Sequence, residues 1–236
     1  MINAEIWMAD ILCQLQQVFG TRLQYLGLQG SYRRGEATES SDIDVVVLLD
    51  AVALDDLDTY RSIVRAMPEG QKACGFFGST ADLLNWPRHE LFGFYKDTDD
   101  YYGKLKSFLP VLSSKDAAEA VRIGAAGLMH MLTHAYLYAP ADARARILKD
   151  ACKAAFFVMQ VQHWLVFGVY CRSKKELLLQ LEGADKIIIK TGLDFSQAIA
   201  EIPENDIYSI LLRWCSTMLH AASLQLCADT ACARRA

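Results

Sequence analysis

The chain has 236 residues, of which 53% are hydrophobic, 22% are charged and only 5 are proline. This composition can fill one large core or two modest ones, and it excludes an intrinsically disordered, collagen-like or disulfide-scaffold protein. The 24 basic and 28 acidic side chains give a net charge of -4, which argues against bulk attraction to nucleic acid phosphates.

The cysteines and the apolar stretches bear on the cellular location. The 7 cysteines are scattered in no paired spacing, and the residues after Met1 lack a signal-peptide pattern. We therefore expect reduced thiols and a cytoplasmic protein. The most apolar stretch, 154–170, is interrupted by polar side chains and is shorter than the roughly 20 residues that span a bilayer. It predicts a buried helix and no membrane partner.

The first half of the chain alternates helical and extended patterns. Apolar residues at helical spacing from Ile6 to Val18 predict an amphipathic helix that ends at Gly20. Later runs rich in apolar and β-branched residues predict strands, with helices between them. We expect strands at 23–28, 42–49 and 72–77, helices at 55–67 and through Leu91 and Phe94, and a loop at 97–103.

From residue 113 onward the pattern is helical throughout. Successive capping residues and prolines mark helix starts after Ser113, Pro140, Ser173 and Pro203. We therefore predict an N-terminal α/β (α+β) domain with a small mixed sheet at 1–112, followed by a C-terminal α-helical bundle at 113–236.

One pattern carries chemistry: Gly30 and Ser31, then ten residues, then Asp42-Ile43-Asp44. Glycine lets the backbone approach a ligand closely after a strand, and Ser31 offers a hydroxyl and free N–H groups to a phosphate. Asp42 and Asp44 are two apart on a strand, so their carboxylates share a face and can hold one or two cations. Carboxylate oxygens select Mg²⁺, which leaves part of its coordination shell to substrate phosphates.

The residues between these two motifs support the same interpretation. Arg33 and Arg34 are placed to neutralise β- and γ-phosphate charge. Either motif alone is a common structural feature, since a glycine-serine pair often ends a strand and an Asp-x-Asp can simply cap a turn. Their combination at this spacing favours metal-assisted phosphoryl chemistry.

The segment 30–44, GSYRRGEATESSDID, resembles the signature of the polymerase-β-like nucleotidyltransferase superfamily in its small bacterial branch. That branch includes aminoglycoside nucleotidyltransferases and minimal nucleotidyltransferases that act as antitoxins to HEPN-type toxins. The resemblance implies Mg²⁺-dependent transfer of AMP from ATP to a hydroxyl of a small-molecule acceptor, such as an aminoglycoside-like antibiotic. It implies metal binding by Asp42 and Asp44, and nucleotide contacts by Gly30, Ser31, Arg34 and Ser41.

The resemblance has one departure. Many family members carry a third carboxylate on the next strand, where it completes the metal site or acts as general base. The matching strand here, 72–77, has none, and the nearest acids are Glu69, Asp82 and Glu90. We take Asp82 as the candidate third catalytic residue, with a helix N-cap as its alternative role.

Other functions stay open at this point. The protein is either an enzyme of this kind, an antitoxin-like regulator that modifies or binds a protein partner, or a nucleotide-binding pseudoenzyme. The acidic, aromatic segment 97–103 would suit a polycationic acceptor, although a solvated loop explains it nearly as well. The base preference, the acceptor and the oligomeric state, a homodimer included, are not fixed by the residues.

Overall fold

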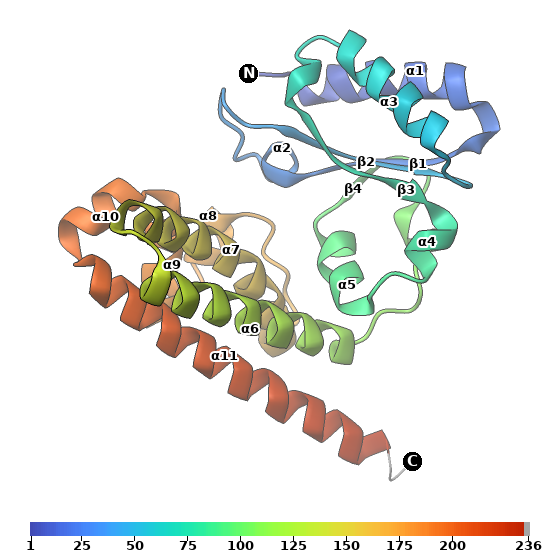
Figure 1. The fold of residues 1–236 in the computed structure, drawn as a ribbon. Coiled ribbons are helices and arrows are strands. Elements are labelled where there is room, and N and C mark those ends of the chain that lie inside the picture. The colour runs from blue at the N-terminus through green and yellow to red at the C-terminus, as the bar shows by residue number, and fades with distance from the viewer. Residues whose placement is uncertain (234–236) are drawn as a thin grey trace. The chain divides into compact units, whose positions relative to one another are not determined.

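The structure, a computed structural model, describes the backbone of residues 1–233 and the side chains of residues 1–227. The chain divides into two compact units, Met1–Leu112 and Ser113–Ala236. Figure 1 shows that the first unit combines helices with a sheet and that the second is helical. This confirms the predicted fold class. Over the described residues, no helix combines the length and the apolar character that crossing a membrane requires.

A mixed sheet of four strands in the order β3-β2-β1-β4 forms the centre of the first unit. β2 runs antiparallel to β1 and parallel to β3, and β4 runs antiparallel to β1. Because β1 and β2 are antiparallel, the end of β1 lies beside the start of β2. The strands are β1 (Leu23–Gln29), β2 (Ile43–Leu49), β3 (Ala73–Ser79) and β4 (Asp99–Tyr102).

Helices cover both faces of this sheet (Figure 1). Ile43, Val45 and Val47 pack into one core with residues of α1 and α3. Val46 and Leu48 point to the other face, where they pack with residues of α4, α5 and the turn after β4. The alternation of strand side chains therefore puts Asp44 on the α4 and α5 face. The helices are α1 (Ala4–Phe19), α2 (Gly30–Arg34), α3 (Leu54–Ala66), α4 (Thr80–Leu84) and α5 (Arg88–Lys96).

Two details of the first unit differ from the prediction. The apolar face of α1 is rotated from the expected one, since Ile6 is 60% exposed, whereas Trp7 and Met8 are buried. The segment 97–103 is not a loop, because Asp99–Tyr102 forms the edge strand β4. Its four residues are too few and too acidic to show a strand pattern in the sequence.

The second unit is built on three long helices, α6, α7 and α11, with shorter helices between the last two. α6 begins where the sequence predicts, because the N–H and the hydroxyl of Ser113 both donate to Asp116 Oδ2 at 2.8 Å. The helices are α6 (Ser114–Tyr138), α7 (Ala141–Phe167), α8 (Lys174–Leu178), α9 (Gly183–Leu193), α10 (Phe195–Glu201) and α11 (Glu204–Ala233). The sequence pattern did not identify α9 and α10.

The cysteines whose side chains the structure describes are all free thiols, and they lie at 13, 74, 152, 171, 215 and 227. Cys232 falls outside the described side chains.

An ion pair joins the start of β1 to α3. Arg22 Nη1 and Nη2 donate to Asp56 Oδ1 and Oδ2 at 2.8 and 2.9 Å, and the Ala53 N–H donates to Asp56 Oδ2 at 2.8 Å. The hydrogen bonds from Arg22 and Ala53 lower the pKa of Asp56 from its ordinary value of 3.8 to about 2.

We expect this shift to make the stability of the first unit depend on pH. A carboxyl whose pKa is lower in the folded state stabilises the fold above its unfolded pKa, and that stabilisation is lost as the pH falls. Asp56→Asn should therefore lower the melting temperature at neutral pH, and the difference from wild type should shrink as the pH falls from about 4 towards 2. Asp55→Asn in the same helical turn is the control. A difference that stays constant with pH would contradict this prediction.

Candidate functional site

The site is organised around the contact between Gly30 and Asp44. Gln29, the last residue of β1, pairs with Asp44 on β2, so the next residue begins α2 directly beside the Asp44 side chain. Gly30 has a φ of 70°, and a Cβ at this position would lie 1.7 Å from Asp44 Oδ2. Only glycine combines this backbone conformation with so close an approach to the carboxylate.

Asp42 and Asp44 lie at the start of β2. Asp42 is exposed and precedes the strand, whereas Asp44 is half-buried within it. Burial raises the pKa of Asp44, the charge of Arg34 acts to lower it, and the charge of Asp42 raises it further. These three charged groups are therefore close enough to interact, as the spacing of the two aspartates predicts.

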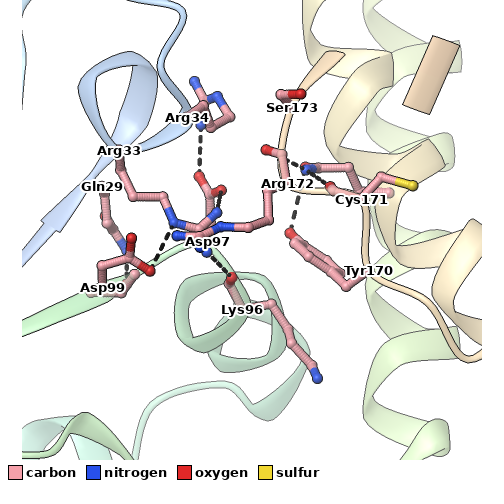
Figure 2. Close-up of polar contacts among 12 residues, drawn as sticks. Gln29, Arg33, Arg34, Lys96, Asp97, Asp99, Tyr170, Cys171, Arg172 and Ser173 are labelled. Carbon is pink, nitrogen blue, oxygen red and sulfur yellow. Dashed lines mark hydrogen bonds and ion pairs between the residues drawn. The ribbon is translucent and has the colours of Figure 1, made fainter. Parts of the chain in front are cut away.

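Figure 2 shows how the two arginines of α2 are held. Arg33, with a side chain only 5% exposed, donates to Asp97 Oδ1 at 2.9 Å, to Asp99 Oδ1 at 3.3 Å and to the Lys96 carbonyl at 3.0 Å. Arg34, whose side chain is 7% exposed, donates to Asp97 Oδ2 at 2.7 Å. One carboxylate therefore binds both guanidinium groups.

This network changes the expected roles of the arginines. Arg33 makes three contacts within the first unit, so it fixes α2 against the segment between α5 and β4. Its predicted role beside the phosphates stays a prediction. Arg34 also binds Asp97, but its charge reaches Asp44. Its predicted contact with nucleotide phosphates stays a prediction.

Asp97 is the residue that the sequence analysis missed. Its side chain is 13% exposed, and burial raises its pKa while Arg34 and Arg33 act to lower it. The nearby Asp100 accepts a hydrogen bond from the Tyr25 hydroxyl at 2.9 Å. These acids are thus engaged by side chains of the first unit, and the predicted contact of this segment with an acceptor stays a prediction. The one sequence signal was the adjacent Arg33-Arg34 pair, which needs an acidic partner when it is buried.

Ser41 and the loop before β2 form a turn of their own. The Thr38 N–H donates to Ser41 Oγ at 2.8 Å, and the Ser41 N–H donates to the Thr38 carbonyl at 3.1 Å. Lys72 Nζ donates to the Glu39 carbonyl at 2.9 Å, which joins this loop to the start of β3. The Ser41 hydroxyl therefore shapes the loop beside Asp42, and its contact with a nucleotide remains a prediction.

The structure does not bring Asp82 together with the two aspartates. Ser79 at the end of β3 pairs with Leu49, five residues along β2 from Asp44, which is about 17 Å along the strand. Asp82 lies in the first turn of α4, where it accepts a hydrogen bond from Ser79 Oγ at 2.6 Å while its N–H donates to the same oxygen at 3.0 Å. Ser79 is therefore the N-cap of α4, and Asp82 binds it from the first turn of the helix. Asp82 is not itself the N-cap that we had considered as its alternative role.

The other two acids also have local partners. Glu69 forms an ion pair with Lys72 at 2.8 Å, and Glu90 accepts a hydrogen bond from the Trp86 indole at 2.7 Å. The position next to Asp44 on β3 is occupied by Cys74, whose thiol is exposed. Paired residues of neighbouring strands point to the same face, so the place beside Asp44 carries a thiol and no carboxylate.

The chemistry of this edge of the sheet fits a magnesium ion that shares its coordination with a ligand. Asp42 and Asp44 offer carboxylate oxygens, the ligands that Mg²⁺ prefers, and the Asp44 carboxylate packs directly against Gly30, where a Cβ would otherwise lie. Among the described residues, no group of three or more His, Cys, Asp or Glu side chains could hold a metal. Substrate oxygens and water would have to supply the remaining ligands.

Comparison with known proteins agrees with this site. Residues 6–79 match the model of the nucleotidyltransferase domain family. Among solved structures, the fold is similar to that of the spectinomycin adenyltransferase AAD(9) from Enterococcus faecialis, determined with ATP and spectinomycin. The TM-score is 0.54 at 11% identity, and the similarity covers 90% of this chain and 98% of the other. No curated protein sequence matches the chain. The family match confirms the superfamily identified from segment 30–44.

We expect Asp97 to be the main stabilising residue of the site. Asp97→Ala would leave two buried guanidinium groups without their shared carboxylate, which should cost about 3 kcal/mol in the free energy of unfolding. Asp99→Asn is the matched control, because Asp99 is 43% exposed and should cost less than about 1 kcal/mol. Urea denaturation measures both values, and equal losses for the two variants would refute the assignment.

A second prediction concerns Gly30. In Gly30→Ala the new methyl group collides with Asp44 and the backbone keeps a positive φ, so we expect a loss of about 2 kcal/mol in stability. Gly93→Ala is the control, because Gly93 lies in α5 with no atom within 4 Å of the added Cβ. Thermal unfolding of both variants checks the prediction, which fails if Gly30→Ala is as stable as Gly93→Ala.

Proposed function

We propose, because residues 6–79 match the nucleotidyltransferase domain family, that the chain is a nucleotidyltransferase that transfers AMP from ATP to a hydroxyl group of a small-molecule acceptor. The observation that carries this proposal is the position of Gly30 against Asp44, with the exposed Asp42 beside them. It brings the start of α2 next to two carboxylates.

In the proposed reaction, the acceptor oxygen attacks the α-phosphorus of the nucleotide. A new P–O bond forms, the bond between the α-phosphorus and the bridging oxygen breaks, and pyrophosphate leaves. Asp42 and Asp44 would hold Mg²⁺, which when bound offsets the negative charge of the triphosphate and of the leaving group. Ser31, in the first turn of α2, would donate hydrogen bonds to the phosphates.

The buried Arg33 and Arg34 support this chemistry through their contacts with Asp97. Because both guanidinium groups bind one carboxylate, α2 is fixed relative to β1 and β4 before any ligand arrives. A fixed donor set avoids the cost of reorganising the phosphate-binding turn during the reaction. The positive charge of Arg34 near Asp44 also favours the ionised carboxylate that a cation requires.

The proton of the attacking hydroxyl needs an acceptor. Cys74 occupies the β3 position beside Asp44, and Asp82 lies near the other end of β3. We therefore propose that an amine of the acceptor molecule, or water, takes this proton.

The acceptor class that we propose is an aminoglycoside-like antibiotic. Support comes from the resemblance of segment 30–44 and from the fold similarity to the spectinomycin adenyltransferase. We assign acceptor binding, or contact with a partner, to the helical unit 113–236. The free thiols support a cytoplasmic location.

A second function is favoured by Cys74. A site that lacks the third carboxylate suits a regulator or pseudoenzyme that binds a nucleotide and does not transfer it, comparable to the antitoxin branch. The two candidates differ in whether any acceptor becomes labelled.

We expect transfer of radiolabel from α-labelled ATP to one member of an aminoglycoside panel that includes spectinomycin. Asp44→Asn should lower the rate by at least about a hundredfold because it removes a metal ligand. Cys74→Glu should raise the rate by introducing a carboxylate beside Asp44, whereas Cys74→Ser should not. Labelling that Asp44→Asn leaves unchanged would contradict the proposed site, and binding of ATP without labelling of any acceptor would favour the second function.

A further inference from the structure

The second unit carries a cluster of metal-binding side chains on α6. His130, Met131 and His134 are exposed, and all three line a hollow of about 490 Å³. The rest of the lining comes from the end of α6, the residue after it and Ile147 of α7. The hollow shares no residue with the site around Asp44, so the proposed nucleotide chemistry does not use it.

The packing of α6 explains why these three side chains lie together. Three apolar residues at spacings of four and three are buried and face the core of the second unit: Leu128, Leu132 and Ala135. At about 100° per residue, positions 130, 131 and 134 fall on a single sector beside this buried stripe. His130 is four residues before His134 and Met131 is three residues before it. Both are therefore neighbours of His134 on the helix surface.

The two imidazoles are not engaged by other polar groups of the chain. Over the part of the chain that the structure describes, neither ring forms a hydrogen bond or an ion pair, and the ring contacts are between the two histidines and with Tyr138. The ring centroids of His130 and His134 are 6.3 Å apart. Two imidazoles that bind one ion through metal–nitrogen bonds of about 2 Å have centroids roughly 5–6.5 Å apart. The observed separation therefore suits two ligands of one ion.

The chemistry of the lining favours monovalent copper over other metals. Imidazole nitrogen suits copper and zinc, and the soft thioether of Met131 selects Cu(I). Among the described residues that line the hollow, none carries the carboxylate that Mg²⁺ or Ca²⁺ requires. Zinc sites take three or four His, Cys or carboxylate ligands, and the described residues offer no such group of three. The apolar Ala135 and Ile147 also favour a singly charged ion, because burying a charge beside them costs less when the charge is small.

We propose that His130, Met131 and His134 form a Cu(I) site, in which one ring nitrogen of each histidine and the thioether sulfur of Met131 bind a single ion. Binding leaves the oxidation state of the copper unchanged, so the site needs no electron donor or acceptor. The proposal does not depend on the proposed nucleotidyl transfer, and either one can fail without the other.

The test titrates the full chain with Cu(I), supplied as its acetonitrile complex under anaerobic conditions. Exposed thiols, such as those at positions 13, 74 and 227, also bind Cu(I), so the accessible cysteines of the native protein are first alkylated with iodoacetamide. Calorimetry should then show one tight Cu(I) ion per chain, and NMR should show shifts of the ring protons of His130 and His134. A titration with Zn²⁺ should show at least about tenfold weaker binding.

Variants of the exposed ligands test the assignment with little risk to the fold. Met131→Leu keeps an apolar side chain but removes the sulfur, and should weaken Cu(I) binding by about tenfold; His134→Gln should weaken it by about a hundredfold. The matched controls are Met129→Leu, on the same helix but not in the lining, and His220→Gln, at an exposed imidazole of α11. Both should bind like wild type.

Three results would overturn the copper site. The first is an alkylated wild type that binds no Cu(I) or that binds Zn²⁺ as tightly. The second is Met131→Leu binding as tightly as Met129→Leu, which would remove the sulfur from the ligand set. The third is His134→Gln binding as tightly as His220→Gln, which would place the ion elsewhere on the chain.

Discussion

The absence of a Cβ at Gly30 is the constraint on which the site depends. β1 must end, turn and begin α2 within van der Waals contact of the Asp44 carboxylate, and any other residue would put a side-chain atom where Asp44 Oδ2 lies. The antiparallel pairing of β1 with β2 imposes this meeting, because it places Gln29 beside Asp44. The sheet topology and the glycine together bring the start of α2 against the Asp44 carboxylate.

A second layer of interactions holds the start of α2 in place. Two guanidinium groups share Asp97, and all three side chains are largely buried. Such a cluster contributes little net stability relative to apolar residues, but removing its carboxylate takes the shared partner from two buried guanidinium groups and leaves Arg33 with the longer ion pair to Asp99 and Arg34 with the longer one to Glu36. Its value here is positional, since it connects α2 with the segment before β4. The arginines therefore have a structural role in the turn, whether or not they also contact phosphates as the sequence suggested.

How much of the fold and of the site could be predicted depends on how far apart in the sequence the interacting residues lie. The Gly30-Ser31 and Asp42-Ile43-Asp44 motifs each lie within a few residues of the sequence. The strands next to them and the resemblance to the superfamily were therefore predictable. Asp97 was not, because its partners lie more than 60 residues away and no local pattern links them. Asp82 is the converse case, because the sequence suggested a place beside Asp42 and Asp44 that the structure does not give it. An acid soon after β3 seemed able to turn back, but the parallel register of β2 and β3 places it beyond the far end of the sheet.

The most direct measurement is calorimetric titration of the full chain with ATP, with and without Mg²⁺, on the wild type and on the double variant Asp42→Asn, Asp44→Asn. Asp50→Asn, at an exposed carboxylate just after β2, is the control for a lost negative charge. The account predicts binding that requires Mg²⁺, that persists in the control and that is lost in the double variant. Binding of equal strength in the double variant, or binding independent of Mg²⁺, would contradict it.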